Sequence, residues 1–502
     1  MVKREGGALL LSISIDRSSK GSVVQQLCLS LRELVFSGAL QSGERLPASR
    51  ILARELGVAR STIINAYERL GSEGIFEMRI GAGTFVGEAL NSRLPPQVTP
   101  KTTAKKKKIT PPLKLSKQFS EFSNGFVDRL GHKPGPFTTA MPALDVFPGA
   151  LWSKLASRHW RGHPEKSLGY GDSQGYLPLR EAIVSHLRTN RGIECNSSQV
   201  FTMAGAQQAF NVIANVLVDV GDLIWFENPG AIGARNCFVA AGGTLVPLPV
   251  DKQGLVISNH RKANPDFRLA FVTPIHQQPT GATMSLGRRL SLLEAAESAN
   301  AFIIEDDYDG EFSYTGHPLP TLKSIDTAGR VLYVGTFSKT LFPALRLGYV
   351  VVADGLLDAF SKATSAVLPG TPLHTQALVA SFMQEGYFAS HLRRMRKIYA
   401  ERLHALLKAS DKYLHGKLEV LATNAGLHTV GYFAKNYSEF EISRLAAEQG
   451  VTVTPLARFC IQPIKSKGLV LGFSGTNTDA ITKAVKTLSG VFDRVDTARS
   501  KL

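Results

Sequence analysis

A lysine between two apolar runs carries the clearest chemistry in this sequence of 502 residues. Lys339 follows the run 331–334 and precedes the run 349–352, so we expect it in a turn at the end of a strand, partly sheltered but reachable. Partial burial and a neighbouring cation lower the pKa of an amine toward neutrality. Because only the uncharged amine attacks a carbonyl to form an imine, Lys339 is a candidate for Schiff-base chemistry.

Groups that bind phosphate stand near this lysine. Thr336 and Ser338 supply hydroxyl donors, and Arg346 supplies a guanidinium that can bind a phosphate through two parallel hydrogen bonds. Residues 205–207 are expected to begin a helix, where free amides and the helix dipole attract a phosphate, although most helix starts bind nothing. An aldehyde cofactor that carries a phosphate would use all of these groups.

An acidic segment ends a second apolar run. Residues 301–304 have the pattern of a buried strand, and the segment 305–308, Glu-Asp-Asp-Tyr, follows them directly. Acidic residues at the carboxyl end of a strand lie where open α/β sheets bind ligands. A carboxylate there can keep a pyridine nitrogen protonated, which turns the ring into an electron sink. Either motif alone fits a surface lysine or a solvated acidic turn equally well, whereas the two together with Arg346 favour a cofactor site.

The pairing of this acidic segment with Lys339 resembles the fold-type I pyridoxal-phosphate enzymes of the aspartate aminotransferase superfamily. The resemblance implies pyridoxal 5'-phosphate as the cofactor, held on Lys339 as an internal aldimine. It implies that Asp306 pairs with the pyridine nitrogen, that Tyr308 donates to the phenolic oxygen, and that Tyr170 reaches the cofactor phosphate of a neighbouring subunit. His276 precedes a Pro-Thr-Gly turn and fits the same site, although it could equally be a turn residue. The predicted cofactor-binding residues are Gly205, Ala206, Gln207, His276, Asp306, Tyr308, Thr336, Ser338, Lys339, Arg346 and Tyr170.

Alternating helices and apolar strands must position these groups. Near-continuous apolar strands that alternate with helices indicate a mostly parallel sheet covered on both faces. We therefore expect an α/β fold-type I transferase, with a large part over about 137–355, a smaller α/β part over about 356–490 and a tail at 491–502. The expected strands are 223–226, 245–250, 269–273, 302–305, 331–334 and 349–352, and the expected helices are 177–189, 206–218, 374–388 and 391–407.

Residues 1–87 have the pattern of a winged helix-turn-helix. Apolar residues at helical spacing predict helices at 23–36, 47–56 and 60–71, with Gly57 ending the second of them. Residues 74–86 alternate and turn at Gly81 and Gly83, which predicts a β-hairpin wing. The second helix of such a pair enters the DNA major groove.

This module resembles the DNA-binding domain of GntR-type bacterial regulators, through matching residues spread over 38–86. The resemblance implies double-stranded DNA as the partner. Arginine, serine, threonine and asparagine side chains in the module suit hydrogen bonds to phosphates and base edges. The predicted DNA-binding residues are Arg45, Ser49, Arg50, Arg60, Ser61, Thr62, Asn65 and Arg79.

Composition sets the remaining limits. Residues 88–136 are rich in lysine and proline and are predicted to form a flexible linker. Its lysine run 105–108 either adds salt-dependent DNA affinity or is simply solvated. The formal net charge of +17 suits a polyanionic partner. Four cysteines without metal-ligand or disulfide spacing predict no metal site and a reducing cytoplasm, and no segment fits a signal peptide or a membrane span.

The two halves together resemble the MocR-type branch of the GntR regulators, in which a winged helix-turn-helix is fused to an aminotransferase-like domain. The matching segments are 142–148, 169–180, 206–208, 228–235, 276–285, 305–312, 336–349 and 471–473. This resemblance implies a transcriptional regulator of metabolic or transport genes that works as a head-to-tail homodimer. Its effector is an amino compound or pyridoxal phosphate itself. The alternatives are an active aminotransferase with a fused DNA-binding domain and a cofactor-free DNA-binding dimer.

Three positions depart from the aminotransferase pattern. Ala231 stands where an aromatic residue would stack on the pyridine ring, and Ala206 replaces a hydroxyl residue in the phosphate loop. Val470 stands where aminotransferases carry the arginine that binds the substrate carboxylate, which argues against efficient turnover of ordinary α-amino acids. Arg235 and Arg458 are the possible substitutes for that arginine.

Overall fold

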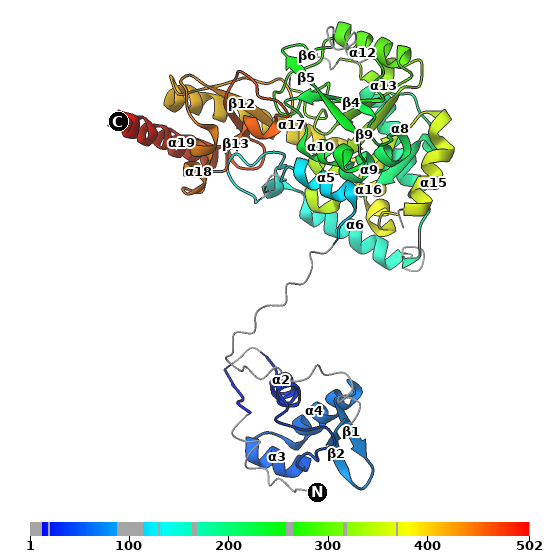
Figure 1. Ribbon diagram of the computed structural model, residues 1–502, viewed down its shortest axis with the longest axis vertical. Coiled ribbons are helices and arrows are strands. Elements are labelled where there is room, and N and C mark those ends of the chain that lie inside the picture. The colour runs from blue at the N-terminus through cyan, green and yellow to red at the C-terminus, as the bar shows by residue number, and fades with distance from the viewer. Residues whose placement is uncertain are drawn as a thin grey trace. The chain divides into compact units, whose positions relative to one another are not determined.

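The computed structural model describes residues 13–18, 21–87, 114–128, 131, 133–162, 168–257, 265–314, 319–367 and 370–500. The chain divides into two compact units, residues 1–112 and 113–502 (Figure 1). The lysine run 105–108 and most of the linker prolines lie outside the described residues. Within the described ranges, no helix is long and apolar enough to cross a membrane.

The described residues of the N-terminal unit form three helices and a hairpin, as the sequence predicts. They are α2 (Val23–Phe36), α3 (Ser49–Leu56), α4 (Arg60–Ser72) and the antiparallel strands β1 (Phe76–Arg79) and β2 (Gly83–Val86). Ser22 begins α2 with a capping box, in which its hydroxyl accepts a hydrogen bond from the Gln25 amide. Gly57 ends α3 with a φ of +64°, a left-handed conformation that favours glycine. Fully buried side chains on α2 and α4, including Leu27, Leu31 and Ile63, form the core.

An eight-stranded sheet forms the centre of the second unit, in the order β3-β10-β9-β8-β7-β4-β5-β6. Strands β4, β5, β7, β8 and β9 are parallel to their neighbours in this set, whereas β10 runs antiparallel to β3 and to β9, and β6 runs antiparallel to β5. The strands are β3 (Val200–Met203), β4 (Leu223–Asn228), β5 (Thr244–Asp251), β6 (Gly254–Leu255), β7 (Leu269–Val272), β8 (Phe302–Asp307), β9 (Val331–Thr336) and β10 (Gly348–Val351).

Both faces of this sheet are buried. Successive residues of a strand point to opposite faces, and in β7 Phe271 joins one apolar cluster whereas Ala270 and Val272 join another. The first cluster includes α9 (Ala206–Leu217) and α10 (Ile232–Ala240), and the second includes α12 (Leu286–Ser298). The predicted parallel core, covered on both faces, is confirmed.

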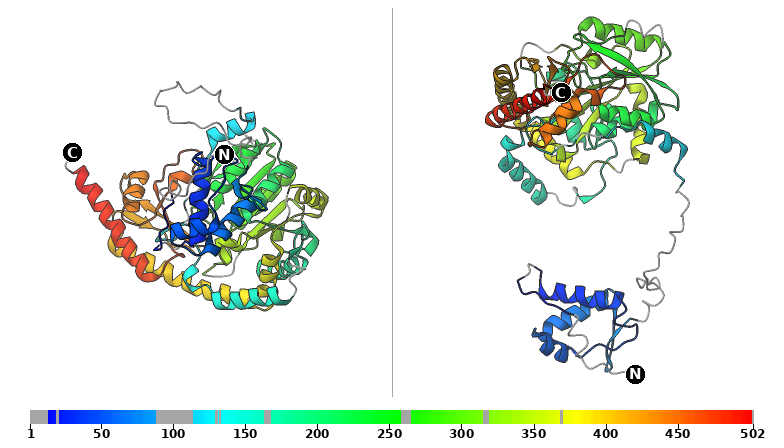
Figure 2. Two further views of the ribbon diagram at one scale, coloured as in Figure 1. Left: turned by 90° about the horizontal axis from the view of Figure 1, so that it is seen from below. Right: turned by 60° about the vertical axis from the view of Figure 1, so that its left-hand side comes forward.

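A smaller four-stranded antiparallel sheet, in the order β11-β12-β14-β13, follows the long helix α17 (Tyr387–Leu414). The strands are β11 (Leu418–Val420), β12 (His428–Phe433), β13 (Thr454–Pro455) and β14 (Gly468–Gly472). With α18 (Glu439–Ala447) and α19 (Thr478–Arg499), this sheet makes up what we call the small lobe (Figure 2). Helices α8 (Leu177–Arg191), α15 (Leu357–Val367) and α16 (Leu373–Gln384) belong to the larger part of the unit, which we call the large lobe.

Two helices extend beyond the expected boundaries. Helix α5 (Lys117–Gly125) lies inside the range expected to be linker, where the Gln118 amide donates a hydrogen bond to the Ala240 carbonyl oxygen at 2.9 Å. Helix α19 runs through residue 491, where a tail was expected. It continues because Val491, Phe492 and Val495 are buried in the core.

Backbone hydrogen bonds join the loop after β8 to the segment before β12. The Tyr314 amide donates to the Asn424 carbonyl oxygen at 2.8 Å, and the Gly426 amide donates to the Phe312 carbonyl oxygen at 2.9 Å. An isolated antiparallel bridge between Ser313 and Ala425 lies between these bonds. The loop that follows the acidic strand end is therefore attached to the small lobe.

Candidate cofactor site

Lys339 lies in α14 (Phe337–Thr340), the single helical turn that directly follows β9. Its Nζ donates a hydrogen bond to the Ala140 carbonyl oxygen at 2.9 Å. Burial lowers the pKa of this amine from 10.5 to about 8, although the Asp309 and Asp306 carboxylates favour its charged form. At neutral pH roughly 10% of such an amine is uncharged, compared with less than about 0.1% of an exposed lysine. The amine is thus suited to the nucleophilic role predicted for it.

Asp306 is the second-last residue of β8, and its carboxylate is buried. Its Oδ1 atom has no hydrogen-bond partner among the described residues. Burial raises the pKa of this carboxyl well above its ordinary value, and the nearby Asp307 and Asp309 raise it further. A buried acceptor without a donor is costly, and a protonated ring nitrogen would supply both the missing donor and a positive charge. The residues present therefore fit a pyridine cofactor.

Two of the predicted phosphate-binding residues, Gly205 and Arg346, lie close together at the start of α9. Gly205 precedes this helix with a φ of +87°, and a Cβ added there would lie 3.9 Å from Arg346 Cζ. Thr336 Oγ1 accepts a hydrogen bond from the Ser338 amide at 3.2 Å, which begins the turn that carries Lys339. Arg346 itself has a φ of +50°, a strained conformation of the kind that is often found at functional sites. A guanidinium beside a helix N-terminus is suited to bind a phosphate.

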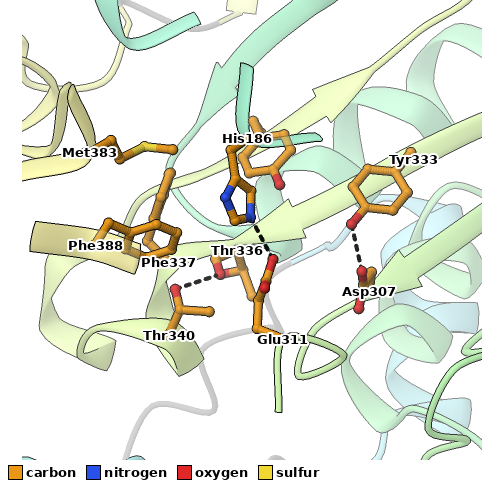
Figure 3. A pocket seen from close by; sticks show the side chains of 10 residues that line it. His186, Asp307, Glu311, Tyr333, Thr336, Phe337, Thr340, Met383 and Phe388 are labelled. Atoms are coloured by element: carbon orange, nitrogen blue, oxygen red, sulfur yellow. Dashed lines mark hydrogen bonds and ion pairs between the residues drawn. The ribbon is translucent and has the colours of Figure 1, made fainter. Parts of the chain in front are cut away.

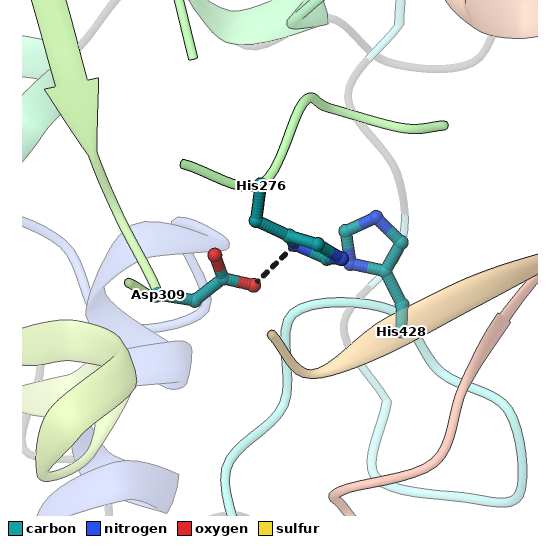
Figure 4. A group of neighbouring side chains, drawn as sticks. All are labelled: His276, Asp309 and His428. Atoms are coloured by element: carbon teal, nitrogen blue, oxygen red, sulfur yellow. Dashed lines mark hydrogen bonds and ion pairs between the residues drawn. The ribbon is translucent and has the colours of Figure 1, made fainter. Parts of the chain in front are cut away.

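Tyr308 and His276 form a buried hydrogen-bonded group with Asp309. Figure 4 shows His276 and Asp309. The Tyr308 hydroxyl donates to the His276 carbonyl oxygen at 2.9 Å. His276 Nδ1 lies 3.0 Å from Asp309 Oδ2 and 3.0 Å from the Tyr308 hydroxyl oxygen. Because a carboxylate only accepts, Nδ1 carries the ring proton. The donation from Tyr308 to a cofactor oxygen stays a prediction, and its hydroxyl is held in place by these contacts.

His428, on β12, contacts this group from the small lobe. Its Nε2 lies 3.2 Å from the Pro279 carbonyl oxygen, so Nε2 carries the proton and donates it. Burial lowers the pKa of His428 to about 3, so the ring is neutral. One ligand atom each from His276, Asp309 and His428 lie within 4.8 Å of one another, a spacing compatible with a metal ion. Hydrogen bonds hold two of the three side chains together without an ion.

Glu227 is a further residue of the site that was not singled out from the sequence. Glu227 is completely buried at the end of β4, and its Oε2 accepts hydrogen bonds from the Thr273 hydroxyl at 2.7 Å and the Gln277 amide at 3.1 Å. Burial raises the pKa of Glu227 to about 7. These contacts fix the turn that carries His276. The acidic residue before Asn-Pro-Gly is the only signal in the sequence that could have pointed to Glu227.

A buried ion-pair network lies on the other side of Asp306, around a small cavity (Figure 3). Arg191 Nε lies 2.9 Å from Asp307 Oδ2, and Arg191 Nη2 lies 3.4 Å from Glu311 Oε1. His186 Nε2 is 2.6 Å from the same Glu311 oxygen. Burial opposes ionisation of Glu311, yet Arg191 and His186 lower its pKa to about 2. The network connects α8 to the segment that follows Asp306.

Replacing Arg191 should destabilise this unit strongly. We expect Arg191→Leu to lower the free energy of unfolding by about 3–5 kcal/mol, because it leaves the buried Asp307 and Glu311 without their cation. Arg188→Leu, on the same helix, removes a largely exposed pair with Glu194 and should cost less than about 1 kcal/mol. Urea unfolding monitored by circular dichroism compares the two variants. Equal losses would show that the buried network does not stabilise the fold.

The remaining predicted site residues lie apart from this centre. Tyr170 is 99% exposed, and its role at the site of another subunit stays a prediction. Arg235 Nη1 donates to the Cys460 carbonyl oxygen at 3.2 Å, and Arg458 Nη2 donates to the Asp128 carbonyl oxygen at 2.7 Å. Both guanidinium groups therefore bond to backbone carbonyls, and a role with an effector carboxylate stays a prediction for each.

The departures noted in the sequence fall on buried positions. Ala231 is 5% exposed directly before α10, where its methyl group offers no aromatic face. Val470 is 1% exposed and lies in an apolar cluster with Ile232, Val430, Leu456 and Phe459. Gln207, a predicted phosphate-loop residue, donates a hydrogen bond from its side chain to the Gly233 carbonyl oxygen at 2.7 Å. It therefore connects the start of α9 to α10.

In the N-terminal unit, the predicted DNA-binding side chains are at the surface. Arg45, Arg50, Arg60, Ser61, Asn65 and Arg79 are exposed, and Ser49 and Thr62 are half-buried. Arg60 and Ser61 begin α4, and Arg60 Nε donates to the Ser49 hydroxyl oxygen at 3.4 Å. Arg79 ends β1 in the wing, with its guanidinium 4.8 Å from the centre of the Phe85 ring. The exposed start of α4 has the geometry of a recognition helix.

Comparison with known proteins defines the class of each unit. Residues 24–86 match the family described as bacterial regulatory proteins, gntR family, and residues 150–488 match aminotransferase class I and II. The structure is similar to the multiple substrate aminotransferase from Thermococcus profundus, with a TM-score of 0.67, 26% identity and coverage of 76% of this chain and 96% of that one. The chain thus combines a GntR-type DNA-binding domain with a fold-type I aminotransferase domain.

Relatives share the whole arrangement. The probable rhizopine catabolism regulatory protein MocR of Rhizobium meliloti is 37% identical over 95% of both chains. The pyridoxine biosynthesis transcriptional regulator PdxR of Corynebacterium glutamicum is 29% identical over 95% of this chain and 98% of its own. The chain belongs to the MocR family of GntR-type transcriptional regulators. Its aminotransferase class I and II domain implies pyridoxal 5'-phosphate as the cofactor, and its GntR-type domain implies DNA binding.

Proposed function

We propose that this regulator acts in the cytoplasm as a head-to-tail homodimer on an operator in double-stranded DNA, and that it senses pyridoxal phosphate or an amino compound at Lys339. The observation that carries this proposal is the pairing of a buried amine, whose pKa is about 8, with the unpartnered Asp306 Oδ1 in one site. The exposed polar start of α4 on the same chain supplies the DNA contact.

Lys339, Asp306 and Arg346 would each bind a different part of the cofactor. When bound, pyridoxal phosphate supplies an aldehyde that reacts reversibly with primary amines. Lys339 provides the protein's own amine, and the Ala140 carbonyl oxygen orients its Nζ. Asp306 would accept a hydrogen bond from the ring nitrogen, and Arg346 with the start of α9 would bind the phosphate. An amine effector competes with Lys339, which leaves the lysine side chain free to move.

Regulation requires that the effector bind two states of the protein differently. Lys339 contacts Ala140 only while its amine is free to donate a hydrogen bond, so the segment around Ala140 has different neighbours in the two states. Ala140 is itself strained, with a φ of +59°. This segment follows the linker range directly, and we propose that its movement changes the spacing or orientation of two DNA-binding modules.

Footprinting tests this function. We expect the full-length protein to protect a discrete site upstream of its own gene or a neighbouring gene, and the pattern to change when pyridoxal phosphate or an amine is added. The competing function is an active aminotransferase, which Val470 in its apolar cluster opposes. Turnover of an amino acid and 2-oxo acid pair at about 1 s⁻¹ or faster, without a footprint, would contradict the proposed regulatory function and support an active aminotransferase.

The rate of cofactor attachment should depend on pH in a defined direction. Because burial lowers the pKa of Lys339 to about 8, the uncharged amine increases up to pH 8 and is nearly complete above pH 9. We expect the rate to rise about tenfold per pH unit below pH 8 and then to level off. Stopped-flow absorbance with pyridoxal phosphate measures this rate, with N-acetyl-lysine methylamide as the reference amine. A protein rate that rises as far as that of the reference, to about pH 10, contradicts a lowered pKa.

A further inference from the structure

Two buried acceptor atoms in the group formed by Tyr308, His276 and Asp309 have no hydrogen-bond partner among the described residues. They are Asp309 Oδ1 and His276 Nε2, and both side chains are 1% exposed. The Asp309 carboxylate has the largest effect of any charge on the Lys339 amine, which places it close to the reacting nitrogen. Figure 4 shows that the Asp309 carboxylate and the two imidazole rings point toward one another.

The hydrogen bonds already made by these side chains show that both atoms accept. His276 Nδ1 donates to Asp309 Oδ2, so His276 Nε2 carries a lone pair. Asp309 Oδ2 also accepts from the Leu427 amide at 3.1 Å, which leaves Oδ1 without a donor. Buried acceptors of this kind are stabilised by a ligand that brings hydroxyl or ammonium donors. A carboxylate brings only further acceptors and negative charge.

Strand β12 of the small lobe carries His428 and continues into a buried apolar cluster, which we call the apolar wall. Val430 and His428 are two residues apart on β12 and therefore lie on the same face, and Val430 pairs with Val470 on β14. Both valines pack against Ile232 in a buried apolar cluster. A carboxylate placed there would lose its hydration without gaining a donor, which is strongly unfavourable.

Three arginines that are candidates for binding a carboxylate are already engaged. Arg346 lies at the start of α9, where the cofactor phosphate is expected. Arg235 and Arg458 donate to the carbonyl oxygens of Cys460 and Asp128. The charges that act on the Lys339 amine are accordingly two carboxylates and the single guanidinium of Arg346.

We infer that the effector is a primary amine that carries hydroxyl groups and lacks a carboxylate, and that Asp309 Oδ1 and His276 Nε2 accept hydrogen bonds from those hydroxyls. The inference rests on the proposed function, because the amine must bind beside Lys339. It makes Asp309 and His276 the residues that determine effector specificity, and it assigns Val430 and Val470 to the exclusion of amino acids.

Calorimetric titration of the full-length, cofactor-loaded protein tests this inference with matched probes. The pairs are 2-amino-1,3-propanediol and serine, 3-amino-1-propanol and β-alanine, and 4-amino-1-butanol and 4-aminobutanoate. We expect each amino alcohol to bind at least about tenfold more tightly than its carboxylate partner, the equivalent of about 1.4 kcal/mol. Amino acids that bind as tightly as the alcohols, or more tightly, overturn the inference.

Two variants test which residues cause the preference for amino alcohols over amino acids. Asp309→Asn replaces a carboxylate by an amide of the same shape. Because the lost charge also acts on Lys339, it changes the binding of every amine, and it should weaken the amino alcohols about tenfold more than n-butylamine, which has no hydroxyl. Val470→Arg should strengthen the amino acids at least about tenfold, because it places a donor in the apolar wall. Equal weakening of n-butylamine and the amino alcohols in Asp309→Asn would contradict the assigned acceptor role.

The result also separates this inference from the proposed function. Borohydride reduction followed by peptide mass spectrometry shows whether pyridoxal phosphate is attached to Lys339. If it is not attached, the proposed function fails. If it is attached and the amino acids bind more tightly, the inference alone fails, and Arg235 becomes the first candidate for the carboxylate.

Discussion

Replacing Lys339 by alanine should abolish covalent attachment of pyridoxal phosphate. After incubation with the cofactor and borohydride reduction, we expect a phosphopyridoxyl mass on the Lys339 peptide of the wild type and none in the variant. The visible absorption band of the bound cofactor should disappear in parallel. The physical reason is that, among the described residues, this amine combines a pKa of about 8 with the Arg346 guanidinium and an Asp306 Oδ1 atom that has no partner there.

Lys323 is a control that shows whether a lowered pKa alone is enough for attachment of the cofactor. Lys323 is also buried enough to have a lowered pKa, but its Nζ donates to the Val331 carbonyl oxygen and lies 3.9 Å from Asp326. Lys323→Ala should therefore retain full attachment at Lys339. Attachment that persists in Lys339→Ala, or that is lost equally in both variants, would contradict the assigned role of Lys339. Because the DNA-binding module is a separate unit, Lys339→Ala should still bind DNA but lose the response to amines.

Replacing Asn65 by alanine should cost most of the sequence specificity. Asn65 is exposed on α4, the proposed recognition helix, and its amide can pair with a base edge. We expect the affinity for the operator to fall about 5- to 150-fold, the equivalent of about 1–3 kcal/mol. The affinity for unrelated DNA should stay nearly unchanged, because phosphate contacts supply it. Fluorescence anisotropy at a fixed salt concentration measures both affinities.

Ser72→Ala is the control for this experiment. Ser72 is exposed at the other end of the same helix, and its hydroxyl donates to the Arg69 carbonyl oxygen at 2.7 Å. It should bind operator DNA as the wild type does. If Asn65→Ala weakened unrelated DNA as much as the operator, Asn65 would contact the backbone rather than a base.

Local patterns predicted most of the elements. The spacing of Leu27, Leu31 and Val35 gave the bounds of α2 as observed, and Gly57 marked the end of α3 because its left-handed conformation is a local requirement. The short edge strand β3 was not predicted, since a run of only four residues, one of them a threonine, carries little signal before a helix start. Helix α5 was hidden in a linker-like composition, and its contact with Ala240 is a tertiary effect that no local pattern contains.

For the site, too, local patterns pointed to some residues, whereas others depend on contacts between distant segments. Lys339, Asp306 and Arg346 could be found because each follows a recognisable apolar run. The sequence could not show that Asp309 lies beside Lys339 and His276, since these contacts connect distant segments. Arg191 gave no signal at all, because it reaches Asp307 from a helix more than a hundred residues earlier. Unpaired atoms such as Asp306 Oδ1 become visible only when every neighbour is placed.

The bonds between residues 312–314 and 424–426 have a mechanical consequence. They make the loop after the strand that carries Asp306 and the first part of the small lobe a single cooperative opening unit, of the kind that hydrogen exchange detects as a block of amides with one protection factor. A ligand that stiffens Tyr308 and Asp309 therefore also stiffens β12, although it does not touch most of that strand. The hydrogen-exchange protection of the small lobe should therefore report whether the site is occupied.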